Sequence, residues 1–350
     1  MDTSRLKIMI VNDKLDLRNI IRAYLKAENY TNLTVSENGQ SALRRALADP
    51  PDMIIADDDL PELSGLELLK AVRQHPKLKD VPFILISQEM EQELVARAAE
   101  ARVNAYVIKP FSHKTLADKV NKIFARRLNP TKIDLQYQEA NRLVQGGHLA
   151  AALELYQEAL SATQNAMASI HYRIGRIHER MERQTDAEEN YHEAIGLADQ
   201  YVDAYDALGV LNLVRRQAED ALKYLQQSSQ ISPLNAERQL HLGEALMETG
   251  EFQAAENAFR LALELDPSKT HVYNHVGISL RRQGKLDEAG RYLHRALELS
   301  SDDEHLYYNL GRVYLEQGER EPAMEYLQKA LAINPDFEEA QQLRREIISS

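Results

Sequence analysis

A 34-residue period runs through the second half of the chain and limits its fold more than any other feature. One small residue marks each unit: Ala140, Gly175, Gly209, Gly243, Gly277 and Gly311. Successive markers stand 34 residues apart, except for the 35 residues between the first two. Apolar helical windows at such a period are typical of helical hairpins that stack to bury a shared core. We therefore expect an all-α solenoid of six hairpins.

Two further series of residues support this reading. Alanines stand twelve residues after each marker, and larger side chains recur sixteen residues after it, at Tyr156, Tyr191, Leu225, Phe259, Leu293 and Leu327. Small residues let two antiparallel helices approach closely, and the larger ones fill the space between them. Close packing within each hairpin is thus expected to depend on these positions.

This half of the chain resembles the tetratricopeptide repeat family. The expected repeats are residues 133–166, 168–201, 202–235, 236–269, 270–303 and 304–337, followed by a capping helix over 338–350. The first repeat departs from the family pattern, with Ala140 for glycine and Gln136 for the usual aromatic residue. The resemblance implies an array that binds another protein or a peptide.

The first half of the chain has a different organisation. Short apolar runs alternate with amphipathic helical windows, which predicts a parallel sheet covered by helices, a (βα)₅ unit. The runs are Leu6–Val11, Leu33–Val35, Met53–Ala56, Phe83–Ile86 and Ala105–Ile108. Pro130 stops the last helix because it lacks a backbone N–H. We therefore expect a first domain over residues 1–127 and a linker over 128–132.

Polar residues follow the predicted strands where the strands end. They are Asn12 and Asp13, the run from Asp57 to Asp59, Ser87, and Lys109 with Pro110 and Phe111. In an open parallel sheet, ligands bind beyond the carboxyl ends of the strands, where the strand order reverses. These side chains are therefore the candidate site.

The same residues, in this order and spacing, resemble the receiver domain of two-component response regulators over residues 6–127, which implies a flavodoxin-like fold. The resemblance implies that Asp57 accepts a phosphoryl group from a sensor histidine kinase or a phosphotransfer protein. It implies Mg²⁺ held by Asp13, Asp57 and the backbone carbonyl of Asp59, with Asn12 bound through a water. Lys109 and Ser87 would then contact the phosphoryl oxygens.

The resemblance assigns further roles and shows one departure. Asn12 stands where the family usually has an acid, so weaker Mg²⁺ binding is expected. Asp59 and Glu89 occupy the positions that tune hydrolysis of the phosphoryl group, in a direction that the sequence leaves open. Ser87 and Tyr106 occupy the switch positions. A cis peptide bond at Pro110 would place Lys109.

Two sets of residues in the repeats are candidate partner contacts, each with a plainer reading. His275, Arg281, Arg282, Asn309 and Arg312 form a polar, partly cationic set that suits an acidic peptide or is simply a solvated helix face. Val210, Leu213 and Val214 are apolar and suit a partner helix, a homodimer contact or docking of the receiver. Internal packing of the superhelix explains the second set equally well.

Composition narrows the possible functions. The 350 residues include no cysteine, which excludes disulfides and thiolate chemistry, and no run approaches the ~20 apolar residues of a membrane helix. The formal charge of −12 disfavours binding to nucleic acid. We expect a soluble cytoplasmic protein without a membrane or nucleic-acid role.

The sequence thus predicts a phosphorylation-controlled signalling adaptor, not an enzyme. Asp57 would accept the phosphoryl group, and the repeats would engage or release a protein partner. Two alternatives stay open. One is a scaffold with a degenerate receiver that works without phosphate, and the other is a phosphoryl sink that drains a kinase.

Overall fold

The computed structural model describes residues 3–88, 92–162 and 167–349. The chain divides into two compact units, residues 1–202 and 203–350. The first unit contains a five-stranded parallel sheet with covering helices and four further helices, and the second unit is all helical. The predicted class, an α/β domain followed by helical hairpins, is confirmed.

The sheet of the first unit has the order β2-β1-β3-β4-β5, and all four strand pairs are parallel. The strands are β1 (Ile8–Val11), β2 (Leu33–Ser36), β3 (Met53–Asp57), β4 (Phe83–Ser87) and β5 (Ala105–Ile108). Because β1 pairs with both β2 and β3, the strand order reverses at β1. The predicted polar residues follow β1 and the three strands on that side of it.

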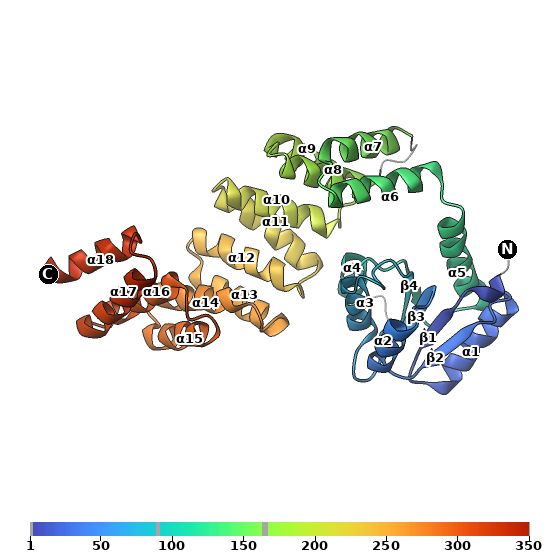
Figure 1. The fold of residues 1–350 in the computed structure, drawn as a ribbon, viewed down its shortest axis with the longest axis horizontal. Helices are drawn as coiled ribbons and strands as arrows, with labels where there is room; N and C mark the ends of the chain where they lie inside the picture. The colour runs from blue at the N-terminus through green and yellow to red at the C-terminus, as the bar shows by residue number, and fades with distance from the viewer. Residues whose placement is uncertain (1–2, 89–91, 163–166, 350) are drawn as a thin grey trace. The chain divides into compact units, whose positions relative to one another are not determined.

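Helices cover both faces of the sheet (Figure 1). The helices α1 (Leu15–Ala27) and α5 (His113–Leu128) pack on one face, and α2 (Gly39–Ala48), α3 (Gly65–Gln74) and α4 (Gln92–Glu100) pack on the other. Side chains along β1 point alternately to the two faces of the sheet. Ile8 and Ile10 pack in the core under α1 and α5, and Met9 and Val11 pack in the core under α2, α3 and α4. A short 3₁₀ turn, η1 (Thr3–Arg5), precedes β1.

Two helical hairpins complete the first unit. They comprise α6 (Lys132–Gln145), α7 (Leu149–Ser161), α8 (Ala168–Arg180) and α9 (Gln184–Leu197). Thr131 caps α6 in a capping box with Asp134, and Arg126 of α5 donates to the same Asp134 carboxylate, Nε to Oδ1 at 2.7 Å. Burial opposes ionisation of Asp134, but the hydrogen bonds from Arg126 and Thr131 prevail and lower its pKa. The last helix of the α/β domain is therefore fastened to the first hairpin.

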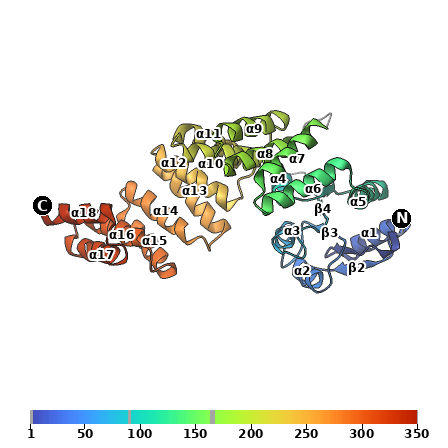
Figure 2. The same ribbon diagram turned by 45° about the horizontal axis from the view of Figure 1, so that its top comes forward.

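The second unit consists of four hairpins and a final helix (Figure 2). Its helices are α10 (Val202–Val214), α11 (Ala218–Ile231), α12 (Ala236–Glu248), α13 (Phe252–Leu265), α14 (Thr270–Arg282), α15 (Leu286–Leu299), α16 (Glu304–Glu316), α17 (Arg320–Ile333) and α18 (Glu338–Ser349). The marker glycine of each first helix lies against the large side chain sixteen residues later. A Cβ added to Gly243 would stand 2.4 Å from the Phe259 ring. The period thus records close contact within each hairpin.

No helix in the described ranges is both long and apolar enough to cross a membrane.

Candidate functional site

The strand register brings the predicted polar residues to one edge of the sheet. Asp57, the last residue of β3, pairs with Ile86, and Ser87, the last residue of β4, pairs with Ile108. Asn12 directly follows β1, and Lys109 directly follows β5. Four strands therefore supply the site, and the sheet core beneath them fixes its geometry.

Asp57 is the centre of this arrangement and is 2% exposed. Its Oδ2 accepts a hydrogen bond from Lys109 Nζ at 2.5 Å and another from the Asn12 side-chain amide. Its Oδ1 lies 3.4 Å from the backbone N–H of Asp59. The two strong donors thus use one carboxylate oxygen and leave the other only weakly engaged. Lys109 offsets the buried charge.

Arg18 supports the loop after β1 from behind and was missed by the sequence analysis. Its Nη1 donates to the carbonyls of Asn12 at 2.6 Å and Asp13 at 3.1 Å, and its Nη2 donates to Glu37 at 3.0 Å. The residue is 6% exposed and shares the buried stripe of α1 with Ile21 and Leu25. A charged residue at an apolar phase of an amphipathic helix was the available signal.

Gly65 lets the loop after β3 close against the acceptor. A Cβ at this position would lie 2.1 Å from the carbonyl oxygen of Asp57, so any side chain would displace the strand end. The backbone N–H of Gly65 donates to the carbonyl of Asp58 at 2.9 Å, and Ser64 caps α3 in a capping box with Glu67. Helix capping and a glycine contact therefore fix the loop that carries Asp58 and Asp59.

The three consecutive aspartates have different environments. Asp57 is buried, Asp58 is half-buried and Asp59 is exposed. Burial, followed by the charge of Asp57, raises the pKa of Asp58. Asp13 is exposed beside the buried Asn12. Within residues 3–88, 92–162 and 167–349, no three acidic or histidine side chains gather closely enough to hold a metal ion. A cation here would also need backbone and water ligands.

The remaining candidate residues of the α/β domain lie around this centre. Ser87 is 6% exposed, and Tyr106 of β5 is half-buried against the core beneath α2, α3 and α4. The Lys109–Pro110 peptide bond is cis, as the resemblance implies. Glu89 lies outside the described residues.

The candidate partner residues of the second unit are only partly on the surface. Val214 is 67% exposed, but Val210 and Leu213 are half-buried. Arg281 and Asn309 are buried, Arg282 is exposed, and His275 stacks on Phe259 with ring centroids 5.1 Å apart. The structure brings Arg281 and Arg312 together on Glu316, a residue that the sequence analysis did not single out.

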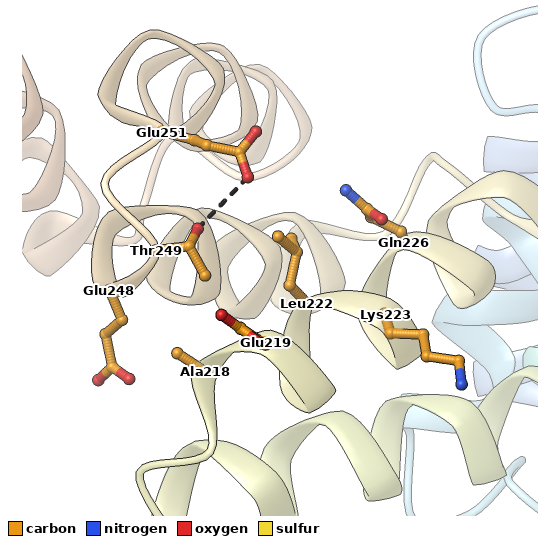
Figure 3. A pocket seen from close by; sticks show the side chains of 8 residues that line it. All are labelled: Ala218, Glu219, Leu222, Lys223, Gln226, Glu248, Thr249 and Glu251. Atoms are coloured by element: carbon orange, nitrogen blue, oxygen red, sulfur yellow. Dashed lines mark hydrogen bonds between the residues drawn. The ribbon is translucent and has the colours of Figure 1, made fainter.

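The second unit also has an open pocket of about 600 Å³ where α11 faces the turn between α12 and α13. Its lining includes Glu219, Lys223, Glu248 and Glu251. Figure 3 shows Glu248 and Glu251 pointing apart, and Thr249 donates to Glu251 at 3.4 Å. These side chains do not converge on a common point, so the pocket has no evident chemistry.

Known families match both parts of the chain. Residues 8–121 match the response regulator receiver domain, and residues 137–207, 215–274 and 280–347 match tetratricopeptide repeat models. Chemotaxis protein CheY of Pseudomonas aeruginosa is 36% identical over 121 residues, which are 35% of this chain and 98% of that protein. CheY-3 of Vibrio cholerae is 35% identical over 121 residues, 35% of this chain and 93% of that protein.

Solved structures resemble the repeats in fold alone. YrrB, described as a TPR protein with an unusual peptide-binding site, aligns with a TM-score of 0.51 and 23% identity, covering 54% of this chain and 97% of that one. PilF of Pseudomonas aeruginosa aligns with a TM-score of 0.51 and 18% identity, covering 61% of this chain and 97% of that one.

Proposed function

Because this chain belongs to the response regulator receiver family and continues into a tetratricopeptide repeat array, we propose that it is a phosphorylation-controlled adaptor. Asp57 accepts a phosphoryl group from a sensor histidine kinase or a phosphotransfer protein, and the repeats bind a protein partner. The observation that carries the proposal is the buried Asp57 carboxylate, paired with Lys109 at 2.5 Å where the carboxyl ends of four strands meet.

The transfer exchanges one bond for another at phosphorus. A carboxylate oxygen of Asp57 forms the new O–P bond, the P–N bond to the donor imidazole breaks, and the imidazole nitrogen keeps the electron pair. Lys109 moves from the carboxylate to a phosphoryl oxygen. The positive ammonium group thereby stays beside the negative charge that the phosphoryl group brings. Ser87, at the end of β4, donates from its hydroxyl to a second oxygen. The weakly engaged Oδ1 is the free acceptor oxygen.

The donor set suits Mg²⁺. The carboxylates of Asp13 and Asp57 and the carbonyl of Asp59 are hard oxygen donors, and two carboxylates with waters are the usual complement for this ion. When bound, the cation would neutralise charge on the phosphoryl oxygens. Asn12 donates to Asp57 Oδ2, so its neutral amide supports one oxygen of the acceptor carboxylate by a hydrogen bond.

The test is the intact mass of the full chain after incubation with Mg²⁺ and acetyl phosphate. We expect one phosphoryl adduct, lost in Asp57→Asn and retained in Asp59→Asn, which alters an exposed residue of the same aspartate run. A folded protein that gains no adduct would reject the adaptor and favour the phosphate-independent scaffold. An adduct that hydrolyses within seconds, without any effect on partner binding, would favour the phosphoryl sink.

A further inference from the structure

Two loops carry the candidate cation ligands, and both contact a third segment that supplies no ligand. Asp13 lies on the loop after β1, and Asp59 lies on the loop after β3. The third segment is residues 37–39, where β2 leads into α2. We call it the β2–α2 turn.

Arg18 joins the loop after β1 to this turn. Its Nη1 donates to the carbonyls of Asn12 at 2.6 Å and Asp13 at 3.1 Å, and its Nη2 donates to Glu37 Oε1 at 3.0 Å. A guanidinium group is planar, so its N–H groups have fixed directions. Because both carbonyls are bound to one rigid group, the Asp13 carboxylate extends from a backbone of fixed orientation.

The loop after β3 contacts the same turn at two points. The side-chain amide of Asn38 donates to Glu62 Oε1 at 3.0 Å. A Cβ added to Gly39 would stand 2.0 Å from the carbonyl oxygen of Leu63. Asn38 also caps α2, since its side-chain oxygen accepts from the backbone N–H of Ser41 at 2.7 Å. The turn is therefore fixed to α2 and supports the loop after β3.

The charge of Arg18 does not explain its place near a cation site. Like charges repel, so a guanidinium group near Mg²⁺ weakens binding by its charge alone. The Arg18 side chain is 8% exposed and is paired with Glu37. Position and charge therefore predict opposite effects of losing Arg18. Mg²⁺ binding weakens if the hydrogen bonds of Arg18 matter most, and tightens if its charge does.

We propose that Arg18 and the β2–α2 turn are positioning residues for the divalent cation. Together they fix the distance between the Asp13 carboxylate and the ligands at the end of β3. Placement matters here because Asn12 is neutral, which leaves the carboxylates of Asp13 and Asp57 to attract the cation. This inference rests on the phosphoryl-acceptor role proposed above and identifies what sets the Mg²⁺ affinity of that site.

The test is calorimetric titration of the full-length chain with MgCl₂, together with the rate of adduct formation from acetyl phosphate at rising Mg²⁺ concentrations. We expect Arg18→Met to raise the Kd for Mg²⁺ about tenfold, as for other groups that orient metal ligands. The rate at saturating Mg²⁺ should stay within about twofold of wild type, because Arg18 acts through backbone carbonyls and not on the acceptor carboxylate. Arg18→Lys keeps the charge but not the planar fork, so its Kd should stay at least about fivefold above wild type.

Asn38→Ser tests the other contact of the turn. Serine keeps a helix cap at this position, but its short side chain does not reach Glu62. We expect the Kd for Mg²⁺ to rise about threefold, as for the loss of one hydrogen bond.

Arg73→Met is the matched control. Arg73 also donates to backbone carbonyls, those of Lys79 at 3.1 Å, Val81 at 2.8 Å and Arg102 at 3.0 Å. These carbonyls precede β4 and β5, at the amino ends of the strands and away from the candidate site. Its loss should lower the unfolding temperature in EDTA, as Arg18→Met does, but change the Kd for Mg²⁺ by less than about twofold.

Tighter or unchanged Mg²⁺ binding in Arg18→Met, an unchanged Kd in Asn38→Ser, or an equal loss of affinity in Arg73→Met would each overturn the inference. A wild-type chain that binds no Mg²⁺ would overturn it too, and the intact mass would still decide the acceptor role. If Arg18→Met weakened Mg²⁺ binding in a chain that forms no adduct on Asp57, the acceptor role would fail and the inference would stand.

Discussion

At the scale of single residues, Asn12 is the feature that most distinguishes this acceptor site. Its amide donates to Asp57 Oδ2 in a buried position, where the family usually has an acid. Asn12→Asp would replace a donor with a like charge beside the buried Asp57 carboxylate. We expect a loss of ~1–3 kcal/mol of unfolding free energy in EDTA, recovered with Mg²⁺, and Mg²⁺ affinity about tenfold higher.

Thermal unfolding in EDTA and in Mg²⁺, together with calorimetric titration, would measure this effect. Asp57→Asn in the same background removes the repulsion and should abolish the response to Mg²⁺. Equal destabilisation of Asn12→Asp in both buffers would show that Asn12 acts only through packing.

Glu244 gives a second prediction at the same scale. Burial, followed by the charges of Glu248 and Glu237, raises its pKa to about 7, and His275 Nε2 lies 3.8 Å from Glu244 Oε1. Burial lowers the pKa of His275 to about 4, so the pair is not an ion pair near neutral pH. Because the folded state holds the Glu244 proton more tightly, stability falls as pH rises from about 4.5 to about 7.

Glu244→Gln removes the free-energy cost of ionising this partly buried carboxyl group. Its side chain is 34% exposed, so solvent screening limits the gain to ~1 kcal/mol above pH 7, and the difference from wild type should vanish below pH 4.5. Urea denaturation at pH 4, 6 and 8 would measure it. A constant difference across the three pH values would contradict the raised pKa.

At the scale of elements, each hairpin depends on its marker glycine. The Cβ of Gly243→Ala would meet the ring of Phe259, a fully buried side chain, and we expect a loss of ~1–3 kcal/mol. Phe259→Leu in the same chain should recover little of the lost stability, because leucine at this position leaves only 2.4 Å beside Gly209 and 2.7 Å beside Gly277.

The matched control is Gly196→Ala in α9, where nothing lies within 4 Å of the added Cβ. There the better helix propensity of alanine should raise the free energy of unfolding by up to ~1 kcal/mol. Circular dichroism during urea denaturation would record both variants. The same sign of change at both positions would show that close packing is not the reason for glycine.

The elements themselves were largely predictable from the sequence. Buried parallel strands need continuous apolar runs, and the five runs became β1 to β5. Hairpin packing needs small residues at a fixed period, and the markers lie at those contacts. Arg18 and Glu316 were missed, because periodicity describes apolar faces and does not pair charged side chains. The burial of Arg281 was likewise hidden, because it depends on a neighbouring helix 35 residues away.

At the scale of the whole molecule, the connection between the receiver and the repeats decides whether phosphorylation of Asp57 can change the conformation of the repeats. In the first unit, Asp134 has two partners at once, the capping residue Thr131 of α6 and Arg126 of α5. The Asp134 side chain is 9% exposed and that of Arg126 is 67% exposed, and we expect this half-buried ion pair to pass a change in α5 to the start of α6. Phosphorylation of Asp57 should therefore change amide hydrogen exchange in the first turns of α6.

Arg126→Ala tests this route, because Arg126 is 67% exposed and pairs with Asp134 at the start of α6. We expect the phosphoryl adduct on Asp57 to form as in wild type, and the exchange difference in α6 to shrink by at least half. Lys114→Ala, an exposed cation at the other end of α5, is the matched control and should keep the full difference. If Arg126→Ala also kept the full exchange difference, the effect of phosphorylation would pass from the receiver to α6 by another set of contacts. If wild type showed none, the receiver and the repeats would work independently despite their shared helix junction.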